Sequence, residues 1–386
     1  MFDKEINRYN TNSLKYDFKI ERGKPEDIIP MWVADMDFMC PKEILDDMHK
    51  RIDHGIFGYT KEDNEYFEAI NSWYKSNFNV ELKREWLIPT PGVVFALATS
   101  IKILTNEDDY VLINNPVYYP FIDVVIDNKR KVISSDLVLK DNHYEIDFID
   151  FENKIRDYHV KLFLLCSPHN PVGRVWTKNE LDKIIEICKK YNVFIVSDEI
   201  HSDFIWNGKH TCLLNYLDYQ ENIILCTSPS KTFNLAGLQV ANIFIPNSKI
   251  KVKFQNELWN TGYSLINTFG LVACKSAYLK GQNWLDELRD YLKENIITVD
   301  NFLKERLPKI KLIYPEGTYL LWLDFNALGL TDDEIDDIMK NKAKLWLDSG
   351  KIFGNTGKGF QRINIALPKD KLQEALNNLE KAFKDI

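Results

Sequence analysis

The sequence predicts an α/β fold, a mainly parallel sheet sandwiched by helices, with a smaller α+β domain beside it. From about residue 86, short apolar runs alternate with amphipathic segments in strand–helix–strand order. The runs are almost continuously apolar, as in strands buried on both faces of a sheet. A chain of 386 residues also exceeds what one compact core usually accommodates, which favours two domains.

The alternating segments consist of predicted strands that end in turns and of the helices between them. EWLIPTPG predicts a strand ending in a turn, VVFALATSIKIL after it a helix, and DYVLINNP the next strand. HVKLFLLCSPHNP predicts a further strand, followed by the helix TKNELDKIIEICKKYN. In that helix Thr177 and Glu180 form a capping box, and one apolar face is shared by Leu181, Ile184, Ile185 and Cys188. NVFIV and ENIILCT complete the series of predicted strands.

The remainder of the chain has a different pattern. DELRDYLKENIITVDNFLKERL predicts one long helix, and IKLIYPEGTYLLWLDF, TDDEIDDIMKNKAKLWLD and QRINIALP predict an antiparallel set of strands with helices. We therefore expect a large domain over residues 46–284. The small domain combines residues 1–45 with residues 285–386.

Composition excludes several classes of protein. A net charge of -8 and a pI near 5.5, without a basic block, argue against nucleic-acid binding. The amino terminus lacks an apolar signal core, and the longest apolar runs are only strand-sized, so we expect a soluble, cytoplasmic protein without membrane contact. The six cysteines contain no CxxC pair and the seven histidines no metal-binding spacing, so neither disulfides nor a metal site is expected.

Polar side chains follow nearly every predicted strand. Each alone has an ordinary explanation as a turn former, a cap, a core histidine or a packing aromatic. Ligands of open α/β sheets, however, bind at the carboxyl ends of the strands, where these groups would meet. The residues concerned are Gly92, Val93, Val94, Tyr118, Tyr119, Asn170, Asp198, His201, Ser228, Ser230 and Lys231.

This set meets the requirements of pyridoxal 5′-phosphate. The cofactor needs a lysine for its Schiff base and a carboxylate for its pyridinium nitrogen. A helix amino terminus suits its phosphate, and an aromatic ring can stack on its pyridine. Lys231, in SPSKTFNLAGLQ, supplies an amine where a buried strand is predicted to end.

Nine segments in order resemble the fold-type I pyridoxal-phosphate enzymes of the class I/II aminotransferase family. They are MWVADMDF, HGIFGYT, TPGVV, NPVYYPF, LCSPHNPVGRVWT, VSDEIHSDF, SPSKTFNLAGLQ, GTYLLWLDF and RINIALP, between residues 31 and 368. Within the family they are most similar to the MalY/PatB-like branch of cystathionine β-lyases, or C–S lyases.

The resemblance implies a role for each motif residue. Lys231 holds the cofactor, Asp198 pairs with the ring nitrogen, Asn170 bonds the ring oxygen, and Tyr118 stacks on the ring. The phosphate is expected at Gly92, Val93, Val94, Ser228 and Ser230, with Tyr59 reaching it from the other subunit of a homodimer. Lys231, Asp198 and Tyr59 are the expected catalytic residues, and His201 is a further cofactor contact. The substrate-binding residues are Arg362, which grips the carboxylate, with Ala34, Asn170 and Tyr119.

Two positions depart from better-known aminotransferases. Those enzymes often carry tyrosine where this chain has His201, which the lyase branch shares within its DEIH pattern. They often carry a phosphate-binding arginine soon after the lysine, and NLAGLQVANIFIP has none. Lysine or hydroxyl groups are then expected to replace that arginine.

The implied activity is cleavage of L-cystathionine, cysteine or related thioethers to a thiol such as homocysteine, pyruvate and ammonia, in amino-acid metabolism. Two alternatives stay open. One is an aminotransferase for a neutral or aromatic amino acid, since Lys231, Asp198 and Arg362 serve both reactions. The other is a cofactor-binding regulatory protein that acts through a partner. Trp32, Tyr263 and Tyr319 are candidate pocket-lining residues for the substrate side chain.

Overall fold

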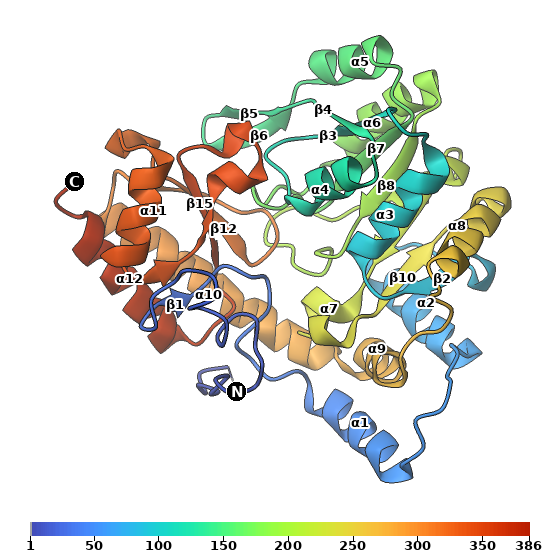
Figure 1. The fold of residues 1–386 in the computed structure, drawn as a ribbon, viewed down its shortest axis with the longest axis horizontal. Coiled ribbons are helices and arrows are strands. Elements are labelled where there is room, and N and C mark those ends of the chain that lie inside the picture. Colours follow the sequence, from blue (N-terminus) through green and yellow to red (C-terminus); the bar gives the residue numbers. More distant parts are fainter. Residues whose placement is uncertain (1) are drawn as a thin grey trace.

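A seven-stranded sheet forms the centre of the computed structural model, which describes residues 2–386 (Figure 1). Strand β10 is antiparallel to both of its neighbours, and the other adjacent pairs are parallel, which confirms the predicted fold class. In spatial order the strands are β2 (Leu87–Thr90), β10 (Ala241–Phe244), β9 (Ile223–Thr227), β8 (Phe194–Asp198), β7 (Leu162–Cys166), β3 (Tyr110–Ile113) and β4 (Lys131–Ser134).

Successive residues of these strands belong to different core clusters. Leu162 and Leu164 pack in one cluster, and Phe163 and Leu165 in the other, because side chains alternate between the faces of a sheet. One face is covered by α3 (Val93–Leu104), α4 (Pro120–Asp127) and α8 (Ser248–Asn260). The other is covered by α2 (Asn64–Phe78), α5 (Phe148–Asp157) and α6 (Lys178–Tyr191). Both faces are therefore buried, as the continuous apolar runs predict.

Helix α6 begins where the sequence places it. The Thr177 hydroxyl accepts from the Glu180 N–H, and the Glu180 carboxylate accepts from the Thr177 N–H, so the capping box is complete. The four apolar residues predicted to share a face are all buried.

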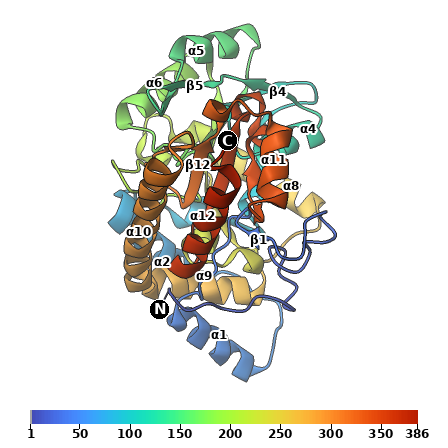
Figure 2. The same cartoon turned by 90° about the vertical axis from the view of Figure 1, so that its left-hand side faces the viewer.

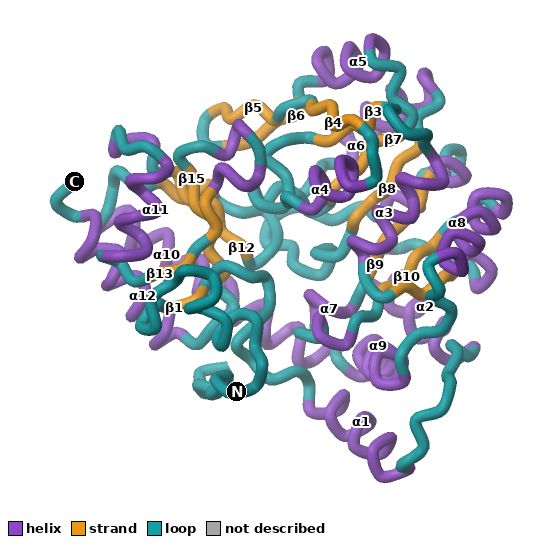
Figure 3. The backbone as a smooth tube through the Cα atoms, in the orientation of Figure 1, coloured by secondary structure: helices purple, strands orange, loops and turns teal. Residues whose placement is uncertain are grey.

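The carboxy-terminal part forms a second, four-stranded antiparallel sheet (Figure 3). Its strands are β11 (Lys311–Ile313), β12 (Leu320–Asp324), β15 (Phe360–Asn364) and β14 (Asp348–Ser349). The long helix α10 (Gln282–Arg306) lies beside α12 (Lys369–Phe383), as Figure 2 shows, and α11 (Asp332–Asn341) completes this region.

The amino-terminal segment returns to this second region, as expected. Strand β1 (Ile29–Pro30) pairs in parallel with β13 (Leu345–Trp346), and the blue amino-terminal segment lies against the orange and red carboxy-terminal elements in Figure 1. The predicted domain boundaries at residues 46 and 285 fall inside α1 (Lys42–His54) and α10, so the division between domains stays a prediction. The remaining strands and α-helices are the hairpin β5 (Leu137–Lys140) and β6 (His143–Ile146), and helices α7 (Pro229–Thr232) and α9 (Thr268–Lys280).

Within residues 2–386, no helix is long and apolar enough to cross a bilayer. In the same part of the chain, no group of three acidic, histidine or cysteine side chains is arranged to hold a metal ion. All six cysteines are free thiols, and all but Cys40 are buried.

Candidate active site

One pocket contains every site residue that the sequence predicts except Tyr59 and two candidate substrate-pocket residues, Tyr263 and Tyr319. It opens at the carboxyl ends of β7, β8 and β9, and residues of the amino-terminal segment and the second sheet close its other side. The predicted residues that line it are Ala34, Gly92, Val93, Val94, Tyr118, Tyr119, Asn170, Asp198, His201, Ser228, Ser230, Lys231 and Arg362. Topology thus brings together groups spread over more than 300 positions of the chain.

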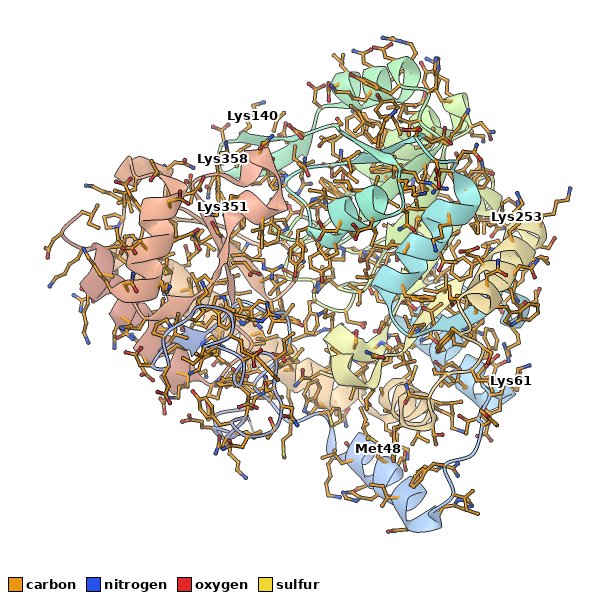
Figure 4. All side chains as sticks on the ribbon, viewed as in Figure 1. Met48, Lys61, Lys140, Lys253, Lys351 and Lys358 are labelled. Carbon is orange, nitrogen blue, oxygen red and sulfur yellow. The ribbon has the colours of Figure 1, made fainter. Side chains whose placement is uncertain are left out.

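Lys231 lies on the short helix α7, directly after β9. Its Nζ donates a hydrogen bond of 2.7 Å to the Ala34 carbonyl. Burial lowers the pKa of this amine to about 8; the positive charge of Arg362 adds to that effect, and the carboxylates of Asp35 and Asp198 oppose it. Exposed lysines such as Lys140 and Lys253 instead project from the surface in Figure 4. A substantial fraction of Lys231 is therefore neutral near pH 8 and able to act as a nucleophile or base.

Asp198 is the last residue of β8 and is 6% exposed. Burial raises the pKa of its carboxyl group to about 7, against the Ile200 N–H bonded at 3.1 Å and the charge of Lys231. No arginine, lysine or histidine in residues 2–386 forms an ion pair with it. A buried carboxylate in this state is stabilised by a cationic ligand atom, such as a protonated ring nitrogen.

Two aromatic residues, His201 and Tyr118, line the pocket together with Lys231 and Asp198. His201 is 3% exposed, and burial, with the charges of Lys231 and Arg362, holds its pKa well below the ordinary value, so the imidazole is neutral. The Tyr118 N–H donates to the Asn170 carbonyl at 2.9 Å, which ties the tyrosine to the loop after β7. The Tyr118 ring is then available to stack on a planar ligand.

The pocket also contains a helix amino terminus and two hydroxyl groups that suit an anion. Helix α3 begins at Val93 without any side-chain cap, so the N–H groups of its first turn are free for a ligand. Gly92, before it, leaves open space where a Cβ would lie. The Ser228 hydroxyl donates to the Val240 carbonyl at 2.6 Å and lies 2.9 Å from the Ser230 hydroxyl. The N–H groups of α3 and the Ser230 hydroxyl are donors that fit a phosphate, and with Lys231, Asp198 and Tyr118 the pocket fits pyridoxal phosphate.

Arg362 is a fixed, buried cation on β15. Its Nη1 donates to Asn170 Oδ1 at 3.0 Å and its Nη2 to the Trp32 carbonyl at 2.9 Å. Nη2 also pairs with Asp348, which lies opposite Arg362 in the β14–β15 ladder. The contact with Arg362 orients the Asn170 amide so that its NH2 group is left for a ligand oxygen. Burial raises the pKa of the Asp348 carboxyl group, and Arg362 opposes this.

The remaining predicted residues have different places. Trp32 lines the pocket. Tyr319 is buried behind it and lies 3.2 Å from the Ala34 carbonyl through its hydroxyl group. Tyr263 packs near Phe95, with ring centroids 5.9 Å apart, rather than among the pocket residues. Tyr59 is 98% exposed in the segment between α1 and α2, away from the pocket of its own chain.

Asp348 and Asp35 are charged groups at this site that our sequence reasoning missed. Asp348 follows the apolar run LWL, so the rule that identified Asp198 also applies to it. Asp35 lies in MWVADMDF, where no periodic pattern marks its position.

Comparisons with known proteins agree with this geometry. The family model described as aminotransferase class I and II matches residues 26–379. Cystathionine beta-lyase PatB of Bacillus subtilis is 41% identical over 99% of both chains. Protein MalY of Escherichia coli is 29% identical over 100% of this chain and 99% of its own.

Solved structures show the same similarity. Cystalysin from Treponema denticola, which contains a pyridoxal 5′-phosphate cofactor, superposes with a TM-score of 0.96 at 38% identity, covering 100% of this chain and 99% of its own. The PLP-bound C–S lyase from Staphylococcus hominis superposes with a TM-score of 0.92 at 33% identity, covering 99% and 98%. This chain belongs to the class I and II aminotransferase family.

Proposed function

We propose that this chain is a pyridoxal-phosphate-dependent C–S β-lyase that cleaves L-cystathionine or related cysteine thioethers. The observation that carries the proposal is the convergence of Lys231, Asp198 and Arg362 on one pocket with an uncapped helix amino terminus. Full-length similarity to PatB and to the C–S lyase structures supports the lyase reaction over the other reactions of the family.

Each residue has a defined task in this reaction. Pyridoxal phosphate, when bound, supplies an electron sink for negative charge at the substrate Cα. Asp198 keeps the ring nitrogen protonated by placing a carboxylate against it. Arg362 binds the substrate carboxylate and so orients the Cα–H bond toward Lys231. Lys231 Nζ then takes the Cα proton, which the lowered pKa of the amine favours.

Loss of the Cα proton allows the bond between Cβ and sulfur to break. The sulfur leaves with the bonding electron pair and takes up a proton as a thiol. The released 2-aminoacrylate reacts with one water molecule to give pyruvate and ammonia. From L-cystathionine the thiol is L-homocysteine.

We also propose that the active unit is a homodimer in which Tyr59 reaches the phosphate of the partner's cofactor. The segment around Tyr59 is apolar and exposed: Ile52, Ile56 and Phe57 are 48%, 65% and 55% exposed. Clustered apolar groups of this kind favour burial against another copy of the chain. In mixed dimers, a subunit with Tyr59→Ala and another with Lys231→Ala should together form one intact site, and the recovered activity measures it. If each site were built from one subunit alone, the mixed dimers would recover no activity.

The cytoplasmic location of the protein stays a prediction.

The test of the activity uses purified protein, pyridoxal phosphate and L-cystathionine without any keto acid. Sustained pyruvate over many turnovers, matched by free thiol, is the expected result. A single turnover that resumes only when a keto acid is added would identify an aminotransferase instead. Cofactor uptake without either reaction would leave a regulatory role, and Lys231→Ala would then be expected to preserve the regulatory effect.

A further inference from the structure

A short strap, residues 32–38, lies over the pocket. Its backbone oxygens contact both basic side chains of the pocket, Lys231 and Arg362. The Trp32 carbonyl accepts from Arg362 Nη2 at 2.9 Å, and the Ala34 carbonyl accepts from Lys231 Nζ at 2.7 Å. The next residue, Asp35, carries a carboxylate. Its charge is the largest electrostatic influence on Lys231 after burial.

Asp35 is held by an ionic cluster that the proposed reaction leaves without a task. Arg8 binds it through both ends of the guanidinium, with Nη1–Oδ1 at 3.0 Å and Nη2–Oδ2 at 2.7 Å. Arg8 Nη1 also bonds Asp37 Oδ1 at 2.7 Å, and Lys15 Nζ bonds Asp37 Oδ2 at 3.0 Å. Lys15 also lies 3.5 Å from Asp35 and is only 1% exposed. We refer to Arg8, Lys15, Asp35 and Asp37 as the clasp.

Arg8 and Lys15 also touch the strap backbone, at the Met36 carbonyl (3.2 Å) and the Asp35 carbonyl (3.5 Å), but two amide side chains outside the clasp bind the same backbone more closely. Asn364 Nδ2 donates to the carbonyls of Val33 and Asp35, each at 2.7 Å. The Asn234 side chain accepts from the Met36 N–H at 3.0 Å and donates to the Met36 carbonyl at 3.0 Å. Four charges, one of them a fully buried lysine, are a costly way to anchor a segment that two amides already hold.

The clasp contains two basic and two acidic side chains, so its charges balance. This balance affects the protonation of the Lys231 amine. In residues 2–386, Lys231 forms no ion pair with Asp35, although the two side chains influence each other. Burial opposes ionisation of Asp35, but the hydrogen bond from Arg8 and the charges of Lys15, Arg8 and Lys231 hold its pKa below the ordinary value. The other titratable or charged groups facing this pair are Asp198, Arg362, His201 and Tyr319. An unopposed Asp35 carboxylate would stabilise the protonated form of Lys231 and so reduce the fraction of neutral amine that can accept a proton.

We propose that Arg8 and Lys15 are positioning residues that hold the Asp35 carboxylate in the clasp, which leaves the Lys231 amine to the Ala34 carbonyl. The inference rests on the proposed role of Lys231 as the cofactor lysine and proton acceptor. It gives the amino-terminal residues 8–16 a part in tuning the reaction. A clasp with only a mechanical task would affect folding but not the charge balance at Lys231.

The test is a spectrophotometric pH titration of the holoenzyme, which follows the cofactor's absorption as the Lys231 nitrogen gains or loses a proton. Arg8→Gln removes the cation that opposes Asp35 and should raise the midpoint by about 1 pH unit, because the carboxylate is then unbalanced. Asp35→Asn removes the carboxylate and should lower the midpoint by a similar amount. The double variant should return close to the wild-type midpoint.

The controls separate charge from anchoring. Arg8→Lys keeps the charge and should keep the midpoint. Tyr16→Phe removes a 2.9 Å hydrogen bond to Asp37 without changing any charge of the clasp, so it should lower the melting temperature but not move the midpoint. The low-pH limb of the kcat/KM profile should move in the same direction as the absorption midpoint in each variant.

Opposite shifts of the two single variants support the proposal. Equal midpoints in all variants, or shifts in one common direction, overturn it. If Arg8→Gln fails to fold, Lys15→Met must raise the midpoint and Asp35→Asn must lower it for the proposal to stand. Failure of the wild-type protein to show a cofactor absorption band would instead refute the proposed function itself.

Discussion

The two walls of the pocket are built in different ways. On the sheet wall, Asn170, Asp198 and Lys231 each lie within four residues of the end of a buried strand. On the opposite wall, Ala34 and Arg362 come from segments more than 300 residues apart, joined by hydrogen bonds between the strap and β15. The sheet wall depends on local geometry, whereas the strap wall depends on long-range contacts. Substitutions on the two walls should therefore affect different properties.

The largest effect is expected on the sheet wall at Lys231. Lys231→Ala removes the proposed cofactor attachment and the proposed proton acceptor, so pyruvate formation should fall by about 1,000-fold or more. Lys253→Ala is the matched control, because Lys253 is exposed and far from the pocket, and its activity should equal wild type (Figure 4). Retained turnover in Lys231→Ala would show that another amine performs the chemistry.

A smaller effect, on substrate binding, is expected when Arg362 on the strap wall is substituted. Arg362→Lys keeps the charge but loses the planar fork that contacts Asn170, Trp32 and Asp348. KM for L-cystathionine should rise by about 10- to 100-fold, with a smaller change in kcat. Arg156→Lys, on the exposed end of α5, supplies a control that should match wild type. A fall in kcat of the same size, with KM unchanged, would contradict a carboxylate-binding role for Arg362.

Asp198, on the sheet wall, should also carry a stability cost, because no cation of the described residues pairs with it as Arg362 pairs with Asp348. Burial raises the pKa of Asp198 to about 7, so ionisation of this carboxyl destabilises the folded apoprotein increasingly from pH 4 upward, and fully above pH 7. Asp198→Asn should therefore stabilise the apoprotein by on the order of 2 kcal/mol at pH 8 and by little at pH 4, while it abolishes activity. Melting temperatures at the two pH values measure this. Equal gains at both values would point to packing rather than charge.

The smallest effects are expected at two helix caps, one in each region. Thr177→Ala on α6 and Thr331→Ala on α11 each break a complete capping box. Each should cost about 1 kcal/mol of stability with activity unchanged, and Thr→Ser at the same positions should cost less. Urea unfolding followed by two probes tests whether the regions unfold together. If each variant lowers the urea midpoint of only one of two unfolding transitions, and a different one in each variant, the predicted two-domain division gains direct support.

The residues of the sheet wall are easier to predict from the sequence than those of the strap wall, because they depend on local geometry. The rule that reactive groups follow buried strands identified Asn170, Asp198 and Lys231, because a strand end fixes where the next few side chains lie. Family motifs added Ala34 and Arg362. Asp348 was missed although it follows an apolar run. Asp35, Arg8 and Lys15 were missed because neither apolar periodicity nor spacing marks an ionic partner 20 or more residues away.

Local sequence patterns are enough to predict the parallel sheet, the long helix α10 and the lysine, carboxylate and amide that the proposed chemistry requires. These follow from hydrophobic period and from the few residues after each strand, both of which are local properties. Packing between distant segments brings Ala34 to Lys231, Asp348 to Arg362, and Arg8 and Lys15 to Asp35. Such contacts depend on how separate segments pack, and an ionic partner 27 or more residues away leaves no periodic trace in the chain.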